Sequence, residues 1–423
     1  MTLHAPSLAI APIDLGAPVG RSLLAALCEQ HGPGIESAMR HFHRLFSLRP
    51  PEAEHLSFVG AQVEVPNSDA PASPQRLSVG ATGETVEAAF QSCIGEGIEL
   101  LSQFERPGDV ARTGSLDGMR PSLDSITCDW IAAHEPAGGV AGPIDWVTGF
   151  DLIGGAPAFV PADLCLRRSS AKIRLAPRAP LSVGCAAGAT RADALLRALL
   201  ELIERDAVAL WWDGGRFGRA VPVEDPAGAR ASALLQRVRG AGAIRRSWLL
   251  DISTGLGAPV MVSISVDSSS RGLACGFAAR LDRSEAAVAA TREMMQVELA
   301  YAVVAAKLAE GGEAALAPTD RRHLVRARTP DLASCPLLHP QGSMEEGRDA
   351  PAASLSELLQ RLAAHSVGCV GIDLGRSDLA VPVCRVVAPA LQTSRESPIT
   401  TRLAATIRDF GGGSRYTGNV DLF

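Results

Sequence analysis

The sequence contains almost no lysine. Of its 423 residues only Lys172 and Lys307 are lysines, so arginine carries nearly all of the positive charge. A phosphate-binding P-loop needs a lysine directly after a glycine and before serine or threonine. Neither lysine follows a glycine, so this class of nucleotide-binding motif is excluded.

Long apolar runs and closely paired cysteines are also missing. No apolar stretch reaches the roughly 18 residues of a membrane-spanning helix, and residues 1–15 lack the basic start of a secretion signal. The nine cysteines include no C-x-x-C pair, which argues against zinc and redox sites. We therefore expect a cytoplasmic protein whose cysteines, Cys185 included, are small buried side chains.

The charge balance is mildly acidic, with a formal net charge of −6. This balance disfavours nucleic acid and anionic membranes as partners. A chain of 423 residues has room for one large domain or for two or three smaller ones.

What the sequence does contain is a small-residue loop that opens directly into a strong helix, over residues 182–206. Thr190 is a good N-cap, and Asp193 three residues later is typical of a capping box. Apolar residues recur at helical spacing and predict one buried face: Ala194, Leu195, Ala198, Leu199, Leu202 and Ile203.

The other face of this helix is charged and allows two interpretations. Asp193, Arg197, Glu201 and Arg205 follow at four-residue intervals, which is the spacing of a solvated salt-bridge ladder worth about 0.3–0.5 kcal/mol per step. Together with Glu204, the same face could instead hold a divalent metal ion and the phosphates that the ion neutralises.

Two further segments favour the metal–phosphate interpretation. Ser92, Glu96 and Glu99 share one face of a helix predicted over residues 84–104, and Glu293 and Gln296 lie one turn apart on a helix predicted over residues 284–307. Three helices with acidic faces could meet at one polyphosphate–magnesium site.

These segments resemble the sequence elements of the YcaO family. Residues 182–206 resemble its S-N-G-x-A-x-G-N-T-x-x-E-A and E-x-x-E-R-D patterns, which are specific. The Ser92 segment resembles its S-x-x-x-E-x-x-E element and the Glu293 segment its E-x-x-Q element, both weak alone. The resemblance covers roughly residues 76–400 and implies an α/β fold that encloses ATP and Mg²⁺.

The resemblance also implies roles for individual residues. ATP would contact Ser92, Glu96, Asp193, Arg205, Glu293 and Gln296, and magnesium would be bound by Glu96, Glu99, Glu201 and Glu204. Carboxylate oxygens suit magnesium, and the fork of an arginine suits phosphate. No catalytic residue is assigned.

The activity implied is ATP-dependent activation of a peptide-bond oxygen in a ribosomally made precursor peptide. The first expectation is azoline formation from Cys, Ser or Thr, with thioamide or amidine formation as other branches. A non-catalytic or weakly nucleotide-binding scaffold subunit is the alternative. The implied partners are the precursor peptide, a leader-binding protein of the E1-like or TfuA type, and a second copy of the chain in a homodimer.

Several positions depart from the family pattern. Val183 and Ala189 stand where the pattern has asparagine, Asp193 replaces glutamate, and Leu100 and Ala289 stand where arginine is common. Ring-forming members often end in a proline-rich tail, whereas this chain ends Gly-Asn-Val-Asp-Leu-Phe. The departures within the motifs favour the scaffold alternative, and the ending without proline weakens the expectation of azoline formation.

Three regions are expected along the chain: an N-terminal extension over residues 1–75, the YcaO domain over 76–400 and a tail over 401–423. The extension should hold helices near 20–30 and 34–47. Within the domain, strands are predicted near 125–132 and at 145–151, 157–161, 247–252, 259–266, 273–280, 368–374 and 381–388. A helix is predicted over 354–365 and a mobile insertion over 310–352. The region around Gly411 is predicted to be a flexible arm, and the tandem Trp211-Trp212 to pack against a sheet or a neighbouring subunit.

Overall fold

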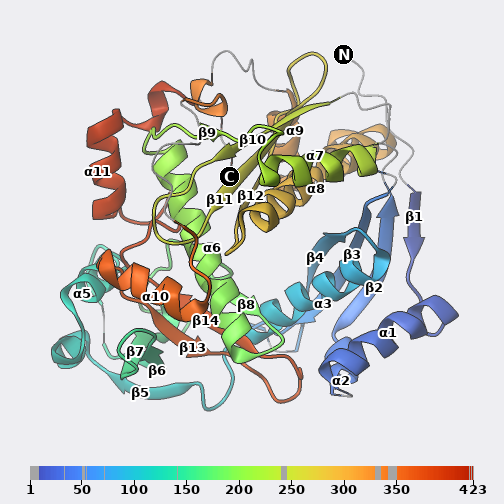
Figure 1. Ribbon diagram of the computed structural model, residues 1–423. Coiled ribbons are helices and arrows are strands. Elements are labelled where there is room, and N and C mark those ends of the chain that lie inside the picture. The colour runs from blue at the N-terminus through green and yellow to red at the C-terminus, as the bar shows by residue number, and fades with distance from the viewer. Residues whose placement is uncertain are drawn as a thin grey trace.

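The computed structural model describes residues 9–418 except 33, 50–52, 54, 71, 141, 240–244, 329–334 and 342–349, and in addition residues 420 and 422. Helices and three antiparallel sheets alternate through the described chain (Figure 1). This mixed architecture confirms the expected α/β fold.

The first sheet belongs to the N-terminal part of the chain. Its strands follow one another in the order β1 (Ala9–Pro12), β2 (Phe42–Arg49), β3 (Ser57–Val65) and β4 (Gln75–Gly83). Helix α3 (Val86–Ser102) packs against β3 and β4. The sheet therefore holds strands from both sides of residue 75, the limit proposed for the extension.

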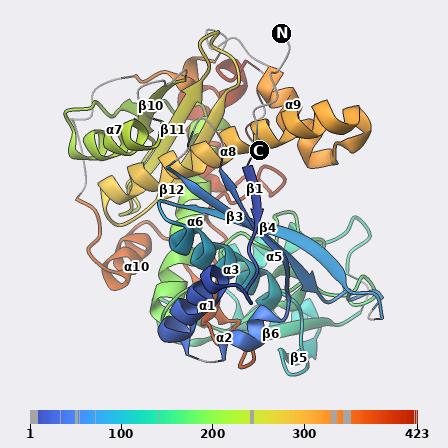
Figure 2. The same ribbon diagram turned by 90° about the vertical axis from the view of Figure 1, so that its right-hand side faces the viewer.

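The second sheet has the order β12-β11-β10-β9. Its strands are β9 (Arg219–Ala220), β10 (Arg246–Asp251), β11 (Val260–Val266) and β12 (Ala274–Ala279). Helices α7 (Pro226–Arg239) and α8 (Arg283–Gly311) lie side by side on one face of this sheet (Figure 2).

The third sheet has the order β5-β6-β13-β14-β8, and β7 pairs with β6. Its strands are β5 (Val110–Gly114), β6 (Ile144–Asp151), β7 (Pro157–Pro161), β8 (Cys185–Ala187), β13 (Val370–Asp373) and β14 (Val383–Val387). The remaining α-helices are α1 (Pro18–His31), α2 (Ile35–Met39), α4 (Leu116–Met119), α5 (Ser125–Ala132), α9 (Pro318–Arg328), α10 (Leu355–Ala364) and α11 (Thr401–Phe410).

Helix α6 (Arg191–Trp212) runs through the middle of the molecule and contacts the second and third sheets (Figure 1). The predicted capping box is present: the Asp193 backbone amide donates to Thr190 Oγ1 at 3.1 Å, and the Thr190 amide donates to Asp193 Oδ2 at 3.1 Å. Fifteen of its residues are buried, among them Trp211 and Trp212, which pack inside the chain itself. The buried stripe therefore fixes α6 as the axis of the core.

Most elements predicted in the central region are confirmed, including the β6–β7 hairpin and the strands that form β10, β11 and β12. The helix predicted over residues 34–47 is wrong in its second half. Only α2 is helical there, and Phe42–Arg49 form β2, because these residues pair with β3 on one side and β1 on the other.

The strand predicted near residues 125–132 is also wrong, because this segment is helix α5. Asp124 caps the helix, accepting a hydrogen bond from the Thr127 amide at 2.8 Å. Ile131 and Trp130 then pack into a small apolar cluster around Trp146. The cap outweighs the β-branched residues of the segment.

The flexible arm predicted around Gly411 is contradicted by the packing of the tail. The Gly413 amide donates to the Asp213 carbonyl at 2.7 Å, and the Gly413 Cα lies so close to the Trp212 carbonyl that a Cβ would fall 1.5 Å from its oxygen. Leu422 is buried in the main core. The tail is therefore part of the folded unit.

The predicted insertion over residues 310–352 is described only in part. Its described residues include α9, which Lys307 of α8 holds through an ion pair of 2.9 Å with Asp320. Residues 329–334 and 342–349 lie outside the described residues.

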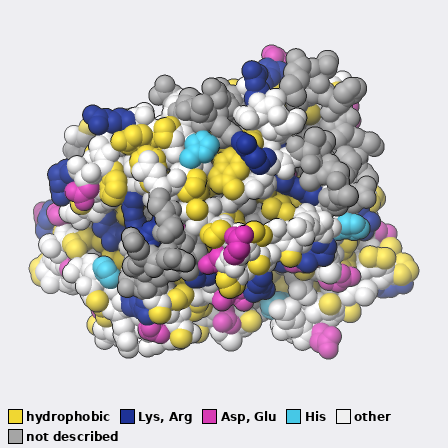
Figure 3. Space-filling model, turned by 45° about the horizontal axis from the view of Figure 1, so that its top comes forward, with side chains coloured by type: hydrophobic (Ala, Val, Ile, Leu, Met, Phe, Trp, Pro, Cys, Tyr) yellow, Lys and Arg dark blue, Asp and Glu magenta, His cyan; other side chains and the backbone are white. Residues whose placement is uncertain are grey.

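On the face shown in Figure 3, basic, acidic and apolar side chains intermingle. Among the described residues, none of the helices combines the length and apolarity required to cross a bilayer.

Candidate functional site

Helices α3, α6 and α8 bring the predicted glutamates to a common region. Glu99 of α3 accepts a hydrogen bond from the Ala187 amide of β8 at 2.6 Å. From α6, Glu201 accepts one from the Gly184 amide at 3.0 Å, three residues earlier in the same loop. The small-residue loop of the sequence motif is thus held between two glutamates from different helices.

Strand β12 does the same on the other side of α6. The Ala279 amide donates to Glu204 at 3.2 Å, and the Phe277 amide donates to Glu293 of α8 at 2.9 Å. Backbone amides of alternate residues in a strand point to the same edge of that strand, and β12 is an edge strand of the second sheet. Glu204 and Glu293 therefore meet the free edge of β12 from two helices.

Arg205 connects these carboxylates. Its Nη2 lies 3.6 Å from Glu201 Oε1 and 3.9 Å from Glu204 Oε1. Burial opposes the charge on Arg205, but the Glu204, Glu201 and Glu293 carboxylates together raise its pKa above the ordinary value. One guanidinium is thus surrounded by glutamates from α6 and α8.

Negative charge is in excess around this arginine. Burial, followed by the carboxylates of Glu201 and Glu293, raises the pKa of Glu96 to about 7. Burial raises the pKa of Glu204 to about 8, with Arg205 opposing and Glu293 and Glu201 adding to the shift. Burial also raises the pKa values of Glu99, Glu201 and Glu293. Burial is the largest cause in every case, and neighbouring carboxylates add to the shift for all of these acids except Glu201.

Glu96 differs from the others in its contact with water. Glu96 is exposed to solvent. The protein atoms around its carboxylate nevertheless disfavour the charged form and raise its pKa. The accessible surface decides whether a ligand reaches it, so we treat Glu96 as the carboxylate at the mouth of the site.

The donor set fits magnesium that is shared with phosphate oxygens. Three carboxylates from α6 and α8 surround Arg205, and two more on α3 interact with them through their charges. Four of these five carboxylates accept a hydrogen bond from a backbone amide. Within the described part of the chain, no three Cys, His, Asp or Glu side chains stand close enough to hold a metal ion by themselves. A cation here would need ligands besides the protein, and hard phosphate oxygens supply them.

The other predicted ATP contacts, Ser92, Asp193 and Gln296, lie on the same three helices. Gln296 donates to Thr82 of β4 at 3.1 Å, which ties α8 to the N-terminal sheet. Ser92 is exposed on α3, four residues before Glu96. Asp193 is also exposed and accepts the hydrogen bonds of the helix cap, eight residues before Glu201 on α6.

The salt-bridge ladder is largely absent. The predicted ladder runs along Asp193, Arg197, Glu201 and Arg205. Among the described residues, the one step of this ladder that forms an ion pair is Glu201–Arg205. Three of the positions that depart from the family pattern are apolar and lie against apolar clusters: Leu100, Val183 and Ala289. Ala189 and Asp193 are exposed.

Sequence reasoning missed Arg385 of β14. This side chain is 3 % exposed, and its Nε and Nη2 have no hydrogen-bond partner among the described residues. It lies opposite Cys185 in the β14–β8 pairing, and its positive charge opposes the burial that raises the pKa of Glu201. No local signal marks Arg385, because only the pairing of distant strands brings it beneath the motif loop. Cys185 itself is buried, as expected from the sequence, and burial raises the pKa of its thiol to about 12.

A cavity of about 790 Å³ opens beside the cluster. Glu201 and Arg205 line it together with Arg178, Arg322 and the segment 392–396. The walls away from the glutamates are therefore rich in arginine, and the cavity is large enough for part of a peptide or a nucleotide.

Comparisons with known families and proteins find relatives of this chain. Residues 80–392 match the family model described as YcaO cyclodehydratase, ATP- and Mg²⁺-binding. An uncharacterised protein in the tfuA 3′ region of Rhizobium leguminosarum bv. trifolii is 29 % identical over 191 residues, which are 42 % of each chain. The chain thus spans less than half of that relative.

Solved structures share the fold. A heterocyclase in complex with substrate and cofactor aligns with a TM-score of 0.65 and 19 % identity, over 85 % of this chain and 53 % of the heterocyclase. YcaO from Methanopyrus kandleri bound with AMPPCP and Mg²⁺ aligns with a TM-score of 0.57 and 19 % identity, over 88 % and 91 % of the two chains. Because the family model covers most of the sequence and contains all three glutamate helices, the chain belongs to the YcaO family.

Proposed function

We propose that the chain uses ATP and Mg²⁺ to activate a peptide-bond oxygen in a ribosomally made precursor peptide. The observation that carries this proposal is the meeting of acidic side chains from α6 and α8 around Arg205, with two glutamates of α3 close enough to interact with them through their charges. An excess of buried carboxylates is unfavourable by itself, and a bound magnesium ion would offset it, while Arg205 would face the phosphates.

Individual residues take defined roles in this proposal. Glu96, Glu99, Glu201 and Glu204 hold magnesium, while Arg205 offers its fork to a phosphate. Glu293 and Gln296 of α8, with Ser92 of α3 and Asp193 at the start of α6, complete the contacts to ATP. Bound ATP would supply the phosphoryl group that turns the peptide oxygen into a leaving group. Catalysis of this type depends mainly on positioning and charge neutralisation.

The product that we propose first is an azoline formed from Cys, Ser or Thr. Thioamide formation is the second candidate, and a specific observation favours it: the relative from Rhizobium leguminosarum lies in a tfuA region. We further propose that the chain works as a homodimer beside a TfuA-type or E1-like protein that binds the leader peptide.

The test is ATP hydrolysis by the full chain, with and without the precursor peptide and partner protein encoded nearby. We expect hydrolysis that the peptide stimulates, and its loss in Glu201→Gln and Glu204→Gln. Glu87→Gln is the matched control, because Glu87 lies exposed on α3 away from the cluster. Mass spectrometry of the peptide separates loss of one water from replacement of oxygen by sulfur.

Two results would count against the enzyme. If the wild-type chain fails to hydrolyse ATP under every combination of peptide and partner, the scaffold alternative replaces it. If both glutamine variants hydrolyse ATP as fast as Glu87→Gln, the cluster is not the nucleotide site.

A further inference from the structure

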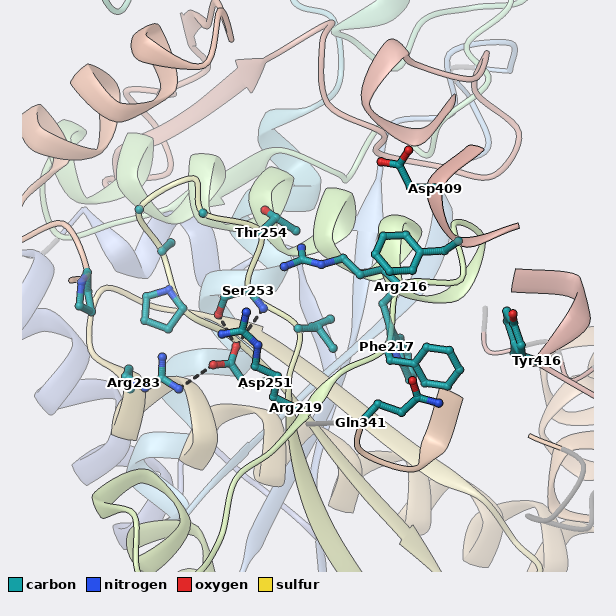
Figure 4. A pocket seen from close by; sticks show the side chains of 18 residues that line it. Arg216, Phe217, Arg219, Asp251, Ser253, Thr254, Arg283, Gln341, Asp409 and Tyr416 are labelled. Atoms are coloured by element: carbon teal, nitrogen blue, oxygen red, sulfur yellow. Dashed lines mark hydrogen bonds and ion pairs between the residues drawn. The ribbon is translucent and has the colours of Figure 1, made fainter. Parts of the chain in front are cut away.

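A second cavity, of about 620 Å³, lies at the C-terminal end of α6. The end of β10, the loop over residues 252–259, the residues just after α6 and the end of α11 surround it (Figure 4). Trp211 lines this cavity and lies seven residues after Glu204, which corresponds to about 10 Å along the helix axis. The cavity is thus separate from the glutamate cluster but close to it.

Three arginines contribute to the wall of this cavity: Arg216, Arg219 and Arg283. The buried acid among them is Asp251, which pairs with Arg283 at 2.7 Å and accepts the Ser253 amide at 2.9 Å. Burial opposes ionisation of Asp251, but Arg283 and Ser253 outweigh it and lower its pKa. The negative charge of Asp251 is therefore already engaged.

Arg216 is left without such a partner. Its guanidinium makes no hydrogen bond or ion pair with any described residue, and Figure 4 shows it directed into the cavity. Burial is the largest cause that lowers its pKa, and the charges of Arg219 and Arg402 add to this shift, whereas the charges of Asp251 and Asp206 only partly oppose it. A half-buried cation beside other cations is stabilised by an added anion.

Thr254 gives a second, independent sign of an absent ligand. Its Oγ1 is buried, lines the cavity and has no hydrogen-bond partner among the described residues. Buried hydroxyls are almost always hydrogen-bonded, and one that is not loses free energy on folding. Arg216 and Thr254 together offer a charged and a neutral hydrogen-bonding group to one ligand.

The opposite wall is aromatic. The rings of Phe217 and Tyr416 lie 5.1 Å apart in an edge-to-face arrangement, and Phe410 at the end of α11 is 42 % exposed. Arginine next to tyrosine and other aromatic side chains is the typical composition of peptide-binding hot spots. An inorganic anion alone would leave this wall and most of the volume unused.

We propose that this cavity binds a carboxylate-bearing residue of a peptide. The carboxylate contacts Arg216 and Thr254, and the adjoining apolar side chain packs on Phe217 and Tyr416. A planar carboxylate matches the fork of a guanidinium. The carboxylate belongs to an acidic side chain or to the C-terminus of the peptide, and the experiment below separates the two.

The position of the cavity suggests how it serves the proposed function. An extended peptide covers 10 Å with about three residues. A carboxylate held at Arg216 would then select peptides with an acid a few residues from the bond that is modified. This step rests on the proposed function, whereas binding of the carboxylate does not.

The test is isothermal titration of the full chain, without nucleotide or magnesium, with three acetylated dipeptides and with inorganic phosphate. Acetyl-Leu-Phe carries a terminal carboxylate, its amide carries none, and acetyl-Glu-Phe amide carries a side-chain carboxylate. We expect at least one carboxylate peptide to bind about tenfold or more tightly than the uncharged amide. Arg216→Gln should remove that difference, and Thr254→Val should reduce it.

Arg120→Gln is the matched control, because Arg120 is an exposed arginine outside the cavity. Circular dichroism and the melting temperature establish that each variant is folded. Equal binding of acid and amide peptides, or unchanged binding in both cavity variants, overturns the proposal. Binding of phosphate as tight as that of the peptides overturns the peptide as ligand.

The assay also separates this proposal from the proposed function. Glu201→Gln and Glu204→Gln should bind the dipeptides like the wild type, since neither glutamate lines this cavity. Loss of ATP hydrolysis with intact dipeptide binding would therefore leave the cavity assigned, and the reverse result would leave the nucleotide site assigned.

Discussion

At the scale of single residues, the site is a set of acids that oppose one another's ionisation. The pKa of Glu204 is raised to about 8, far above that of an ordinary glutamate, mainly by burial. A raised pKa means that the folded protein binds the proton more tightly than the unfolded chain does. The resulting stabilisation is present at low pH and is lost as the pH rises through the folded-state pKa.

A pH dependence of stability follows for the ligand-free protein. Glutamine does not titrate, so Glu204→Gln should have nearly wild-type stability at pH 5 and become the more stable protein by pH 8. We expect the gain to reach about 1 kcal/mol or more. Urea unfolding across this pH range measures it. A constant difference between the two proteins would show that Glu204 is not a buried, repelled acid.

A second prediction at the residue scale concerns Arg385, which the sequence did not indicate. Its buried charge faces the Glu201 side of the motif loop and lacks hydrogen bonds at Nε and Nη2. We expect Arg385→Met to fold but to weaken Mg–ATP binding about tenfold, because the site would lose a cation beneath the glutamates. Arg385→Lys should restore part of the affinity. Calorimetric titration with a non-hydrolysable ATP analogue measures this, and equal affinity of all three proteins would assign Arg385 to packing alone.

At the scale of elements, the site depends on how closely α8 lies against β12. Gly276 has no room for a side chain, since a Cβ there would stand 2.1 Å from the Met294 backbone nitrogen and 2.2 Å from the Ala290 carbonyl oxygen. The next residue, Phe277, gives its amide to Glu293. The close approach of helix and strand therefore sets the position of Glu293.

Gly276→Ala should separate α8 from β12. We expect a loss of stability of about 1–3 kcal/mol from overpacking. The free energy of Mg–ATP binding should fall by more than the free energy of unfolding does. Gly114→Ala is a suitable control, because a Cβ at Gly114 meets no atom within 4 Å. Denaturation and nucleotide titration test the two effects, and wild-type affinity in a folded Gly276→Ala protein would disprove the role of this contact.

The elements also show what sequence alone could predict. The capping box at Thr190 and Asp193 and the apolar stripe that follows are local signals, and they located α6 correctly. By contrast, Phe42–Arg49 became a strand through pairing with β1 and β3, and residues 125–132 became a helix through the Asp124 cap. The glutamates were recognised from their motifs, but their anchoring to β8 and β12 and the place of Arg385 depend on contacts between distant segments.

At the scale of the whole molecule, the C-terminal region completes the core instead of extending from it. Asp206 of α6 is fully buried, pairs with Arg402 of α11 at 2.9 Å and accepts the Gln392 amide at 3.0 Å. The same region supplies Phe410 and Tyr416 to the wall of the 620 Å³ cavity that Arg216 lines. The tail thus joins helix α6 to the cavity for which we propose peptide binding.

Breaking this connection should weaken the whole fold. Asp206→Ala leaves Arg402 and the Gln392 amide without their partner, and we expect a loss of about 3 kcal/mol in the free energy of unfolding. Arg408→Gln on the exposed side of α11 should lose almost nothing. Guanidinium denaturation compares them, and equal midpoints would show that the tail is held by other contacts.

The central claim is that carboxylates of α3, α6 and α8 jointly hold one magnesium–triphosphate. A crystal structure with Mn²⁺ in place of Mg²⁺ and a non-hydrolysable ATP analogue tests it most directly, because manganese is located by its anomalous scattering. We predict manganese bound both by phosphate oxygens and by glutamates from at least two of these helices, with Arg205 on a phosphate. Nucleotide and metal bound elsewhere, with Glu96, Glu99, Glu201 and Glu204 unchanged, would contradict the account.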